Sequence, residues 1–251
     1  MLVKERVLKD IKSRKYTIKI ADTEAEVDAA LKLRYKVFKE ELGRDFKFDD
    51  EKEKDRYDDQ SHHLIVINNE DQSIIGTYRL QTYEMAQDGH GFSSEEKFHI
   101  ENLQANVLQN AVEVGRACIS KEHRSGRILF FLWKGFAEYL THFKKRYLFG
   151  YAALDNTRID VAMNTFHHLK SEGYLHPEYQ IEPKESYKIK GYKKPDLPGE
   201  IDVPPLLRNY LDVGCHICGE PSFYEKNKLS HFIILLDVEN ISNRVKKLFF
   251  G

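Results

Sequence analysis

A glutamate and an arginine stand three residues apart in the segment VEVGRACI, at Glu113 and Arg116. A carboxylate can take a proton from an amine, and a guanidinium can hold a carboxylate through two parallel hydrogen bonds. Taken alone, such a pair is more typical of a partly exposed salt bridge than of a catalytic site. Residues three apart on a strand point to opposite faces, so the two side chains can share one site only if a bulge lies between them.

The basic turn HRSGRI follows this strand and leads into a strongly apolar helix. Backbone N–H groups at a helix N-terminus attract phosphate and other anions. Arg124 and Arg127 place positive charge where the helix dipole disfavours it, which favours an anionic partner over solvated side chains.

The hydrophobic pattern predicts a single α/β domain over residues 1–251. Turn and cap residues bound the segments, and residues 44–60 read as a charged loop. A Pro/Lys/Tyr-rich excursion is expected at about 176–203, and residues 85–105 read as an irregular insertion with a short helix. Strands are expected at 15–21, 63–67, 73–83, 110–119, 147–154 and 231–238, and helices at 22–42, 126–144, 156–173, 204–214 and 239–250.

Composition excludes several classes of protein. The formal net charge is −1, which argues against bulk attraction to nucleic acid. No apolar run is long enough to cross a bilayer, and the basic start lacks the apolar stretch of a signal peptide. Three cysteines do not form a disulfide framework, so a cytoplasmic setting is expected. Cys215 and Cys218 lack further ligands for a metal, and a packing turn is expected there instead.

Several motifs in order resemble the bacterial ornithine-lipid and glycine-lipid N-acyltransferases, a hemolysin-like group of the GNAT superfamily distantly related to acyl-homoserine-lactone synthases. The resemblance covers about residues 15–240. The motifs are LRYKVFKEELG (33–43), YDDQSHHLIV (57–66), IIGTYRL (74–80), EVGRACI (113–119), LFGYAAL (148–154) and PPLLRNYLDVGCHICGEP (204–221).

This resemblance implies a GNAT fold, with a central mixed, twisted sheet flanked by helices. It implies transfer of a long, in some members 3-hydroxylated, acyl chain to the α-amine of ornithine or glycine, without a permanently bound cofactor or a metal. The donor would be acyl carrier protein, with acyl-coenzyme A as the alternative. HRSGRI lacks the second glycine of the usual coenzyme A turn, and we interpret this as favouring the single phosphodiester of a carrier protein. A product this amphiphilic also suggests peripheral contact with the inner membrane.

The resemblance also assigns candidate roles, residue by residue. Glu113 is the first candidate for the base that deprotonates the amine, followed by Asp58, and Arg116 completes the catalytic group. Arg79, His62 and His63 are candidates for binding the acceptor. His62 replaces an aspartate common in the ornithine-lipid enzymes, which leaves the identity of the acceptor open. Arg34, Arg124, Gly126 and Arg127 are candidates for binding the carrier arm; Arg34 is equally well explained as a buried partner of an acidic residue.

Two alternatives remain open at this point. One is another GNAT enzyme, either a coenzyme A-dependent acetyl- or acyltransferase or an acyl-homoserine-lactone synthase. The other is a non-catalytic protein that binds a carrier or a lipid. The choice of donor and acceptor separates the enzymes, and a Glu113→Gln variant separates catalysis from binding.

Overall fold

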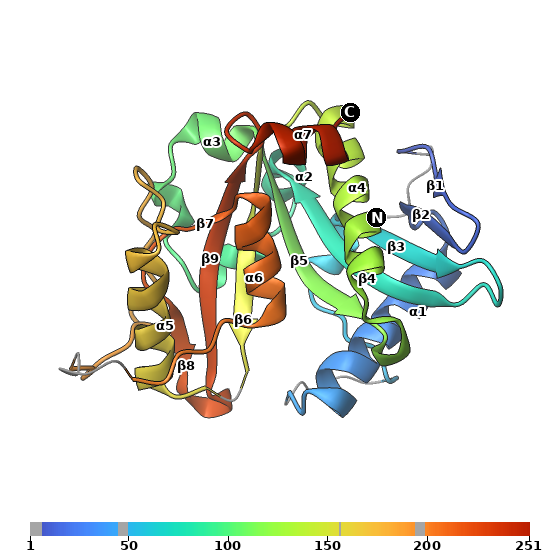
Figure 1. Ribbon diagram of the computed structural model, residues 1–251. Helices are drawn as coiled ribbons and strands as arrows, with labels where there is room; N and C mark the ends of the chain where they lie inside the picture. Colours follow the sequence, from blue (N-terminus) through green and yellow to red (C-terminus); the bar gives the residue numbers. More distant parts are fainter. Residues whose placement is uncertain (1–6, 45–49, 156, 194–198) are drawn as a thin grey trace. The chain divides into compact units, whose positions relative to one another are not determined.

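The computed structural model describes residues 7–44, 50–155, 157–193 and 199–251 (Figure 1). These residues form two compact units. The basic start of the chain, part of the expected 44–60 loop, Asn156 and part of the 176–203 excursion lie outside these ranges. The first unit is drawn from residues 1–91, 112–145 and 246–251, and the second from residues 92–111 and 146–245.

The first unit contains an antiparallel sheet with the strand order β1-β2-β3-β4-β5. Its strands are β1 (Ile11–Lys12), β2 (Tyr16–Ile20), β3 (His62–Asn68), β4 (Ile74–Thr82) and β5 (Ala111–Ile119). The strands predicted in this part of the chain are confirmed. The two-residue β1 was not predicted, because so short a segment leaves no alternating pattern to detect.

Two helices cover opposite faces of this sheet. Helix α1 (Glu24–Tyr35) begins at the N-cap Thr23 and continues as a π-helical turn over Lys36–Glu41. Ala30 of α1 packs in one core cluster with Ile65 of β3. Helix α4 (Gly126–His142) lies against Leu64, the neighbouring residue on the other face, and a Cβ at its Gly135 would fall 2.8 Å from that side chain. Side chains alternate along a strand, so odd-numbered residues of β3 face α1 and even-numbered ones face α4.

Strand β5 contains a bulge. Gly115 pairs with Arg79 and Cys118 pairs with Thr77, so Arg116 and Ala117 both stand opposite one residue of β4. Arg116 adopts a positive φ of 54°, which is uncommon for a residue other than glycine. The bulge required by the spacing of Glu113 and Arg116 is therefore present. It interrupts the alternation of side chains between Glu113 and Arg116, so both side chains can lie on one face of the sheet.

The second unit is built around β9 (Leu229–Asp237), a long buried strand that pairs antiparallel with three others. Its partners are β6 (Tyr147–Leu154), β7 (His216–Ile217) and β8 (Ser222–Tyr224), and the helices of this unit are α3 (Ala105–Gln109), α5 (Ile159–Ser171) and α6 (Pro205–Val213). Two helices remain: α2 (Tyr83–Gln87) follows β4, and α7 (Asn243–Phe249) ends the chain. The α/β class and the longer predicted elements are confirmed.

Between Cys215 and Cys218, where a turn was expected, His216 and Ile217 form the short strand β7. Both cysteines are free and buried, and burial raises the pKa of both thiols well above the ordinary value. Their side chains contribute to packing. Among the described residues, no three His, Cys, Asp or Glu side chains are grouped as metal ligands would be.

Candidate active site

Three arginines and three carboxylates meet on the face of the first unit's sheet that α1 covers. The arginines come from three elements, whereas the carboxylates all come from the segment between α1 and β3. The arginines are Arg34 of α1, Arg79 of β4 and Arg116 of β5, and the carboxylates are Glu53, Asp55 and Asp58. We call these six residues the charge network. Positive and negative charges are equal in number within it.

Arg34 is fully buried at the base of this network. Its Nε donates to Glu53 at 2.5 Å, and its Nη1 and Nη2 donate to the two carboxylate oxygens of Asp58 at 2.6 and 3.1 Å. Of the two roles considered for Arg34, the structure shows the buried ion pair. A guanidinium without exposed surface does not reach a carrier arm in this arrangement.

Asp55 joins the other two arginines. One of its oxygens accepts from Nη1 of Arg79 at 2.5 Å, and the other accepts from Nη2 of Arg116 at 2.6 Å. Arg116 also forms an ion pair with Glu53, with 2.9 Å between Nε and Oε1. The bulge in β5 thus brings Arg116 to the same carboxylate as Arg79.

Asp58 is held in its ionised form. Burial by itself would raise the pKa of this carboxyl, but Arg34 and Arg79 together lower the pKa far below its ordinary value. A carboxylate with so low a pKa is a poor proton acceptor. Asp58 is therefore better suited to hold Arg34 and Arg79 in place than to serve as a base.

His62 and His63 are neighbours on β3 and lie on opposite faces of the sheet. His63 pairs with Arg79 across the strands, and its Nε2 lies 4.0 Å from Asp58. His62 instead shares a 2.8 Å hydrogen bond with the hydroxyl of Tyr139 on α4. The structure therefore brings His63, but not His62, together with the charge network.

Burial lowers the pKa of both histidines to about 4. In the unfolded chain a histidine titrates at about 6.5, so between pH 6.5 and pH 4 the unfolded state binds more protons than the folded state. As the pH falls from 6.5 to 4, we expect the free energy of unfolding to decrease by about 3 kcal/mol for each histidine. Urea denaturation of the parent and of His62→Asn at several pH values measures the contribution of His62 to this pH dependence. Parallel pH profiles for the two proteins would contradict it.

Glu113 lies on β5 two residues before Gly115, the residue that pairs with Arg79. It is 3% exposed and pairs with Gln81, while Gly115 pairs with Arg79. A Cβ built on Gly115 would meet no atom within 4 Å, so there is open space beside Arg79 on this face. Glu113, Arg79 and Gly115 all face the α1 side because paired residues share a face.

Several buried polar atoms on the same face have no hydrogen-bond partner among the described residues. They belong to alternate residues of β3 and β4, so they point the same way. These atoms are Nδ1 and Nε2 of His63, Oγ1 of Thr77, Nη2 of Arg79 and Oε1 of Gln81. Buried polar groups in folded proteins are nearly always paired, so donors and acceptors left unpaired at a cluster are suited to a ligand.

The residues predicted to hold the donor arm lie at the start of α4. Arg124 is engaged within the protein, with Nη2 at 2.6 Å from Glu41 and Nε donating to the carbonyl of Ile119 at 3.1 Å. Gly126 opens the helix, and a Cβ there would meet nothing within 4 Å. Arg127 is exposed and makes no ion pair within the described ranges. The helix start is therefore open and carries one unengaged arginine.

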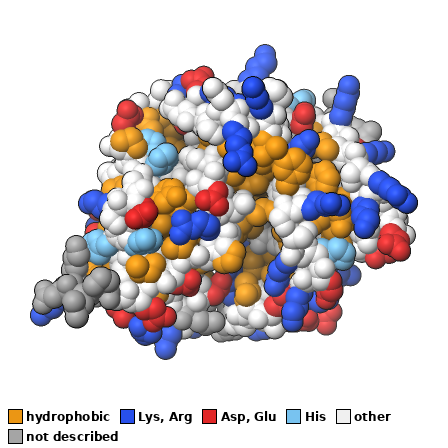
Figure 2. All heavy atoms as spheres, in the orientation of Figure 1, with side chains coloured by type: hydrophobic (Ala, Val, Ile, Leu, Met, Phe, Trp, Pro, Cys, Tyr) orange, Lys and Arg blue, Asp and Glu red, His pale blue; other side chains and the backbone are white. Residues whose placement is uncertain are grey.

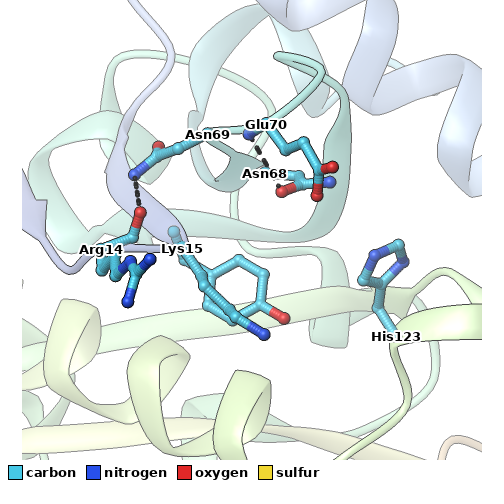
Figure 3. A pocket seen from close by; sticks show the side chains of 7 residues that line it. Arg14, Lys15, Asn68, Asn69, Glu70 and His123 are labelled. Carbon is cyan, nitrogen blue, oxygen red and sulfur yellow. Dashed lines mark hydrogen bonds between the residues drawn. The ribbon is translucent and has the colours of Figure 1, made fainter.

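A surface hollow of about 560 Å³ lies beside this basic turn (Figure 3). Its wall combines the start of β2, the β3–β4 hairpin and the turn before α4. The residues lining it are Arg14, Lys15, Tyr16, Asn68, Asn69, Glu70 and His123. It shares no residue with the charge network, and its cationic side chains suit an acidic partner more than an apolar ligand.

Glu53 and Asp55 were not predicted from the sequence. Their segment, EKEKDRYDD, reads as too charged to pack, yet Glu53 is fully buried. The only signal was a cluster of acidic residues in a chain whose arginines lie elsewhere in the sequence, and charge composition cannot show which charges meet. Arg79 and Arg116 were predicted, and the structure brings both to Asp55.

Comparison with known proteins identifies a domain within this chain and relatives that match most of its length. Residues 33–134 match the model of the acetyltransferase (GNAT) domain. L-ornithine N(alpha)-acyltransferase of Brucella abortus (strain 2308) is 27% identical over 248 residues, covering 90% of this chain and 86% of that protein. The protein with the same name from Rhodobacter capsulatus is 26% identical over 249 residues, covering 93% of this chain and 94% of that protein.

The fold is also that of solved structures. The crystal structure of the AHL synthase LasI aligns with a TM-score of 0.53 and 13% identity, covering 94% of this chain and 95% of that one. The GNAT fold and the acyltransferase class predicted from the motifs are confirmed. The chain carries a GNAT acetyltransferase domain and is homologous over most of its length to proteins named L-ornithine N(alpha)-acyltransferase, so it is an acyltransferase.

Proposed function

We propose that the protein transfers a long-chain fatty acyl group, 3-hydroxylated in its preferred form, from acyl carrier protein to the α-amine of ornithine. The product is an N-acyl amino acid and the first intermediate of an aminolipid. Glycine is the second acceptor to be tested. The proposed place of this reaction is the cytoplasmic side of the inner membrane, where a lipid product is used.

The observation that carries this proposal is the open space at Gly115, which pairs with Arg79 and lies two residues along the strand from Glu113. A carboxylate, a guanidinium and room for a substrate there share one face of the sheet. The names of the ornithine acyltransferase relatives supply the proposed acceptor, because they specify ornithine and its α-nitrogen. Donor and chain length rest on the motif resemblance.

Arg79 is the proposed contact for the α-carboxylate of the acceptor. Its Nη1 is used by Asp55, but its Nη2 has no hydrogen-bond partner among the described residues. A substrate carboxylate can therefore bind Nη2 without displacing Asp55. Arg116 holds the far side of Asp55 and fixes its orientation. Since His62 faces α4, we propose no role for it in choosing the acceptor.

Glu113 is the proposed base, acting directly or through one water. It removes a proton from the ammonium group, and the free amine attacks the thioester carbonyl carbon. The C–N bond forms and the C–S bond breaks. The attacking nitrogen gives its second proton to the departing thiolate of the carrier arm, and Glu113 releases the first proton to solvent. The step consumes one acyl thioester and one amine and yields one amide and one thiol, so no metal or redox partner enters.

The donor arm is proposed to lie along the start of α4, at Gly126 and Arg127. N–H groups of the first helical turn have no intrahelical acceptor and can bind the phosphodiester of the arm. Lys121, Arg127 and the cationic hollow beside them then meet the acidic surface of the carrier protein. Arg34 and Arg124 are engaged elsewhere, and we assign them to the support of the site.

A matrix of donors and acceptors tests this proposal. The purified protein is incubated with 3-hydroxyacyl carrier protein or the matching acyl-coenzyme A, each with ornithine, glycine or S-adenosylmethionine, and products are identified by mass spectrometry. The expected product is Nα-acylornithine from the carrier-bound donor. Product only with coenzyme A would overturn the choice of donor, and an acyl-homoserine lactone would overturn the choice of acceptor.

Filling the space at Gly115 is expected to obstruct the acceptor while leaving the protein folded. Gly115→Ala places its Cβ in open space, and Gly115→Val extends further into it, so Val is expected to raise the KM for the acceptor at least tenfold and Ala less. Steady-state kinetics against acceptor concentration measures this, with thermal denaturation of each variant as the control. A Val variant with unchanged kinetics would show that the substrate does not use this space.

A further inference from the structure

The C-terminal segment exposes apolar side chains beside cationic ones. Leu248 is 46% exposed and Phe250 is 37% exposed, and they are two of only four large apolar side chains exposed among the described residues. Phe249 between them anchors the segment on α4, with its ring 5.5 Å from that of Phe130 and 5.9 Å from that of Trp133. The segment is therefore held in place while its outer side chains face solvent.

Cationic side chains border these apolar ones. Lys247 is exposed in the same segment, and Arg127 and Lys134 project from α4 one turn before and one turn after Phe130. The Nζ of Lys134 lies 5.1 Å from the centre of the Phe130 ring. We call Leu248, Phe250, Phe130, Lys247, Lys134 and Arg127 the C-terminal patch. Figure 2 shows apolar side chains gathered over α7 and the adjoining part of α4, with lysine and arginine side chains around them.

The charge of the patch is one-sided. The sequence from Asn243 to Gly251, NRVKKLFFG, holds three cationic residues and no acidic residue. On α4 the next exposed charged residue beyond Lys134 is Glu138, one turn further along. Apolar and aromatic side chains surrounded by lysine and arginine are the composition that binds the interface of an anionic bilayer.

We propose that the C-terminal patch is a membrane-docking surface for anionic phospholipid bilayers. Leu248 and Phe250 enter the interfacial layer, and Lys247 and Lys134 contact the headgroups. No helix of the described residues is long and apolar enough to span a membrane, so such docking is peripheral. Binding is reversible and weakens as salt screens the headgroup charge.

The positive charge of the patch argues for a lipid surface rather than a second copy of the chain. In an isologous contact the same patch meets itself, so Lys247 and Arg127 would face like charges. An anionic bilayer supplies the opposite charge over the whole patch. Charge complementarity therefore selects the bilayer as the occupant.

Vesicle co-sedimentation of the full chain tests the proposal. Vesicles of phosphatidylglycerol mixed with phosphatidylcholine are compared with vesicles of phosphatidylcholine alone, at low and high salt. The parent is expected to bind the anionic vesicles, Lys247→Glu about twentyfold more weakly, and Leu248→Ser/Phe250→Ser more than tenfold more weakly. Ile201→Ser, which changes an equally exposed apolar residue in the second unit, is the control expected to bind as the parent does.

Two results would overturn the proposal: equal binding by the parent and the patch variants, or no binding of anionic vesicles by the parent. A parent that is dimeric in light scattering, ignores vesicles and becomes monomeric in Leu248→Ser/Phe250→Ser would assign the patch to a second copy instead. Vesicle binding is measured without turnover, and turnover with soluble carrier and amino acid is measured without vesicles. A failure of docking is therefore distinguishable from a failure of the proposed reaction.

Discussion

Replacing Arg34 with methionine is expected to lower the free energy of unfolding by about 3–5 kcal/mol. Methionine fills much of the volume of the arginine side chain but leaves Glu53 and Asp58 buried without their main counter-charge. Removing one partner of a buried ion pair costs far more than the pair itself contributes, because the remaining charge stays desolvated. Urea denaturation of the parent and the variant measures the difference.

Two comparisons make this result specific. Arg14→Met removes an exposed arginine and is expected to change stability by less than about 0.5 kcal/mol. The double variant Arg34→Met/Asp58→Leu removes a charge of each sign, so its loss should be smaller than the sum of the two single losses. Full additivity, or a loss below about 1 kcal/mol for Arg34→Met, would show that the network is not held as described.

Glu113→Gln is expected to lower kcat by about 10²- to 10⁴-fold while leaving donor binding unchanged. Glutamine keeps the shape of the side chain but cannot accept the proton of the ammonium group. Activity of the variant should rise with pH more steeply than that of the parent, because the amine then deprotonates without help. Single-turnover kinetics with carrier-bound donor measures the chemical step directly.

Glu138→Gln is the matched control for this prediction. It changes an exposed glutamate on α4, away from the charge network, and is expected to keep the kinetics of the parent. A Glu113→Gln enzyme with normal kcat would remove Glu113 from the reaction. A variant that makes no product but binds carrier normally would exclude the non-catalytic alternative, provided that the parent is active.

Much of the fold could be predicted from the hydrophobic pattern. Strand 147–154 agrees with β6 residue for residue, and α4 begins at Gly126 as expected. These elements are long, and their periodicity is strong. The β7 strand at His216–Ile217 was missed because two residues carry no period and the flanking glycines suggested a turn. A strand this short is stabilised by pairing with a longer strand, here β9, which lies elsewhere in the sequence and leaves no signal next to β7.

The site was predictable where the strand carried its own signal. Adjacent residues of a strand face opposite ways, so the alternation of β3 could have separated His62 from His63 without a structure. The burial of Glu53 and the pairing of the half-buried Asp55 could not be found in this way. Both carboxylates are matched by arginines from α1, β4 and β5, and no local pattern in the sequence shows which charges meet.

The sharing of carboxylates in the charge network constrains how the gene can change. Each member of the charge network pairs with two others, so any single replacement leaves two neighbours with one partner each and an unequal number of positive and negative charges. A lineage can cross such a barrier only by substituting several of these codons nearly together. The six positions should accordingly be inherited as a block, and an isolated exchange at one of them should mark a descendant whose fold is less stable.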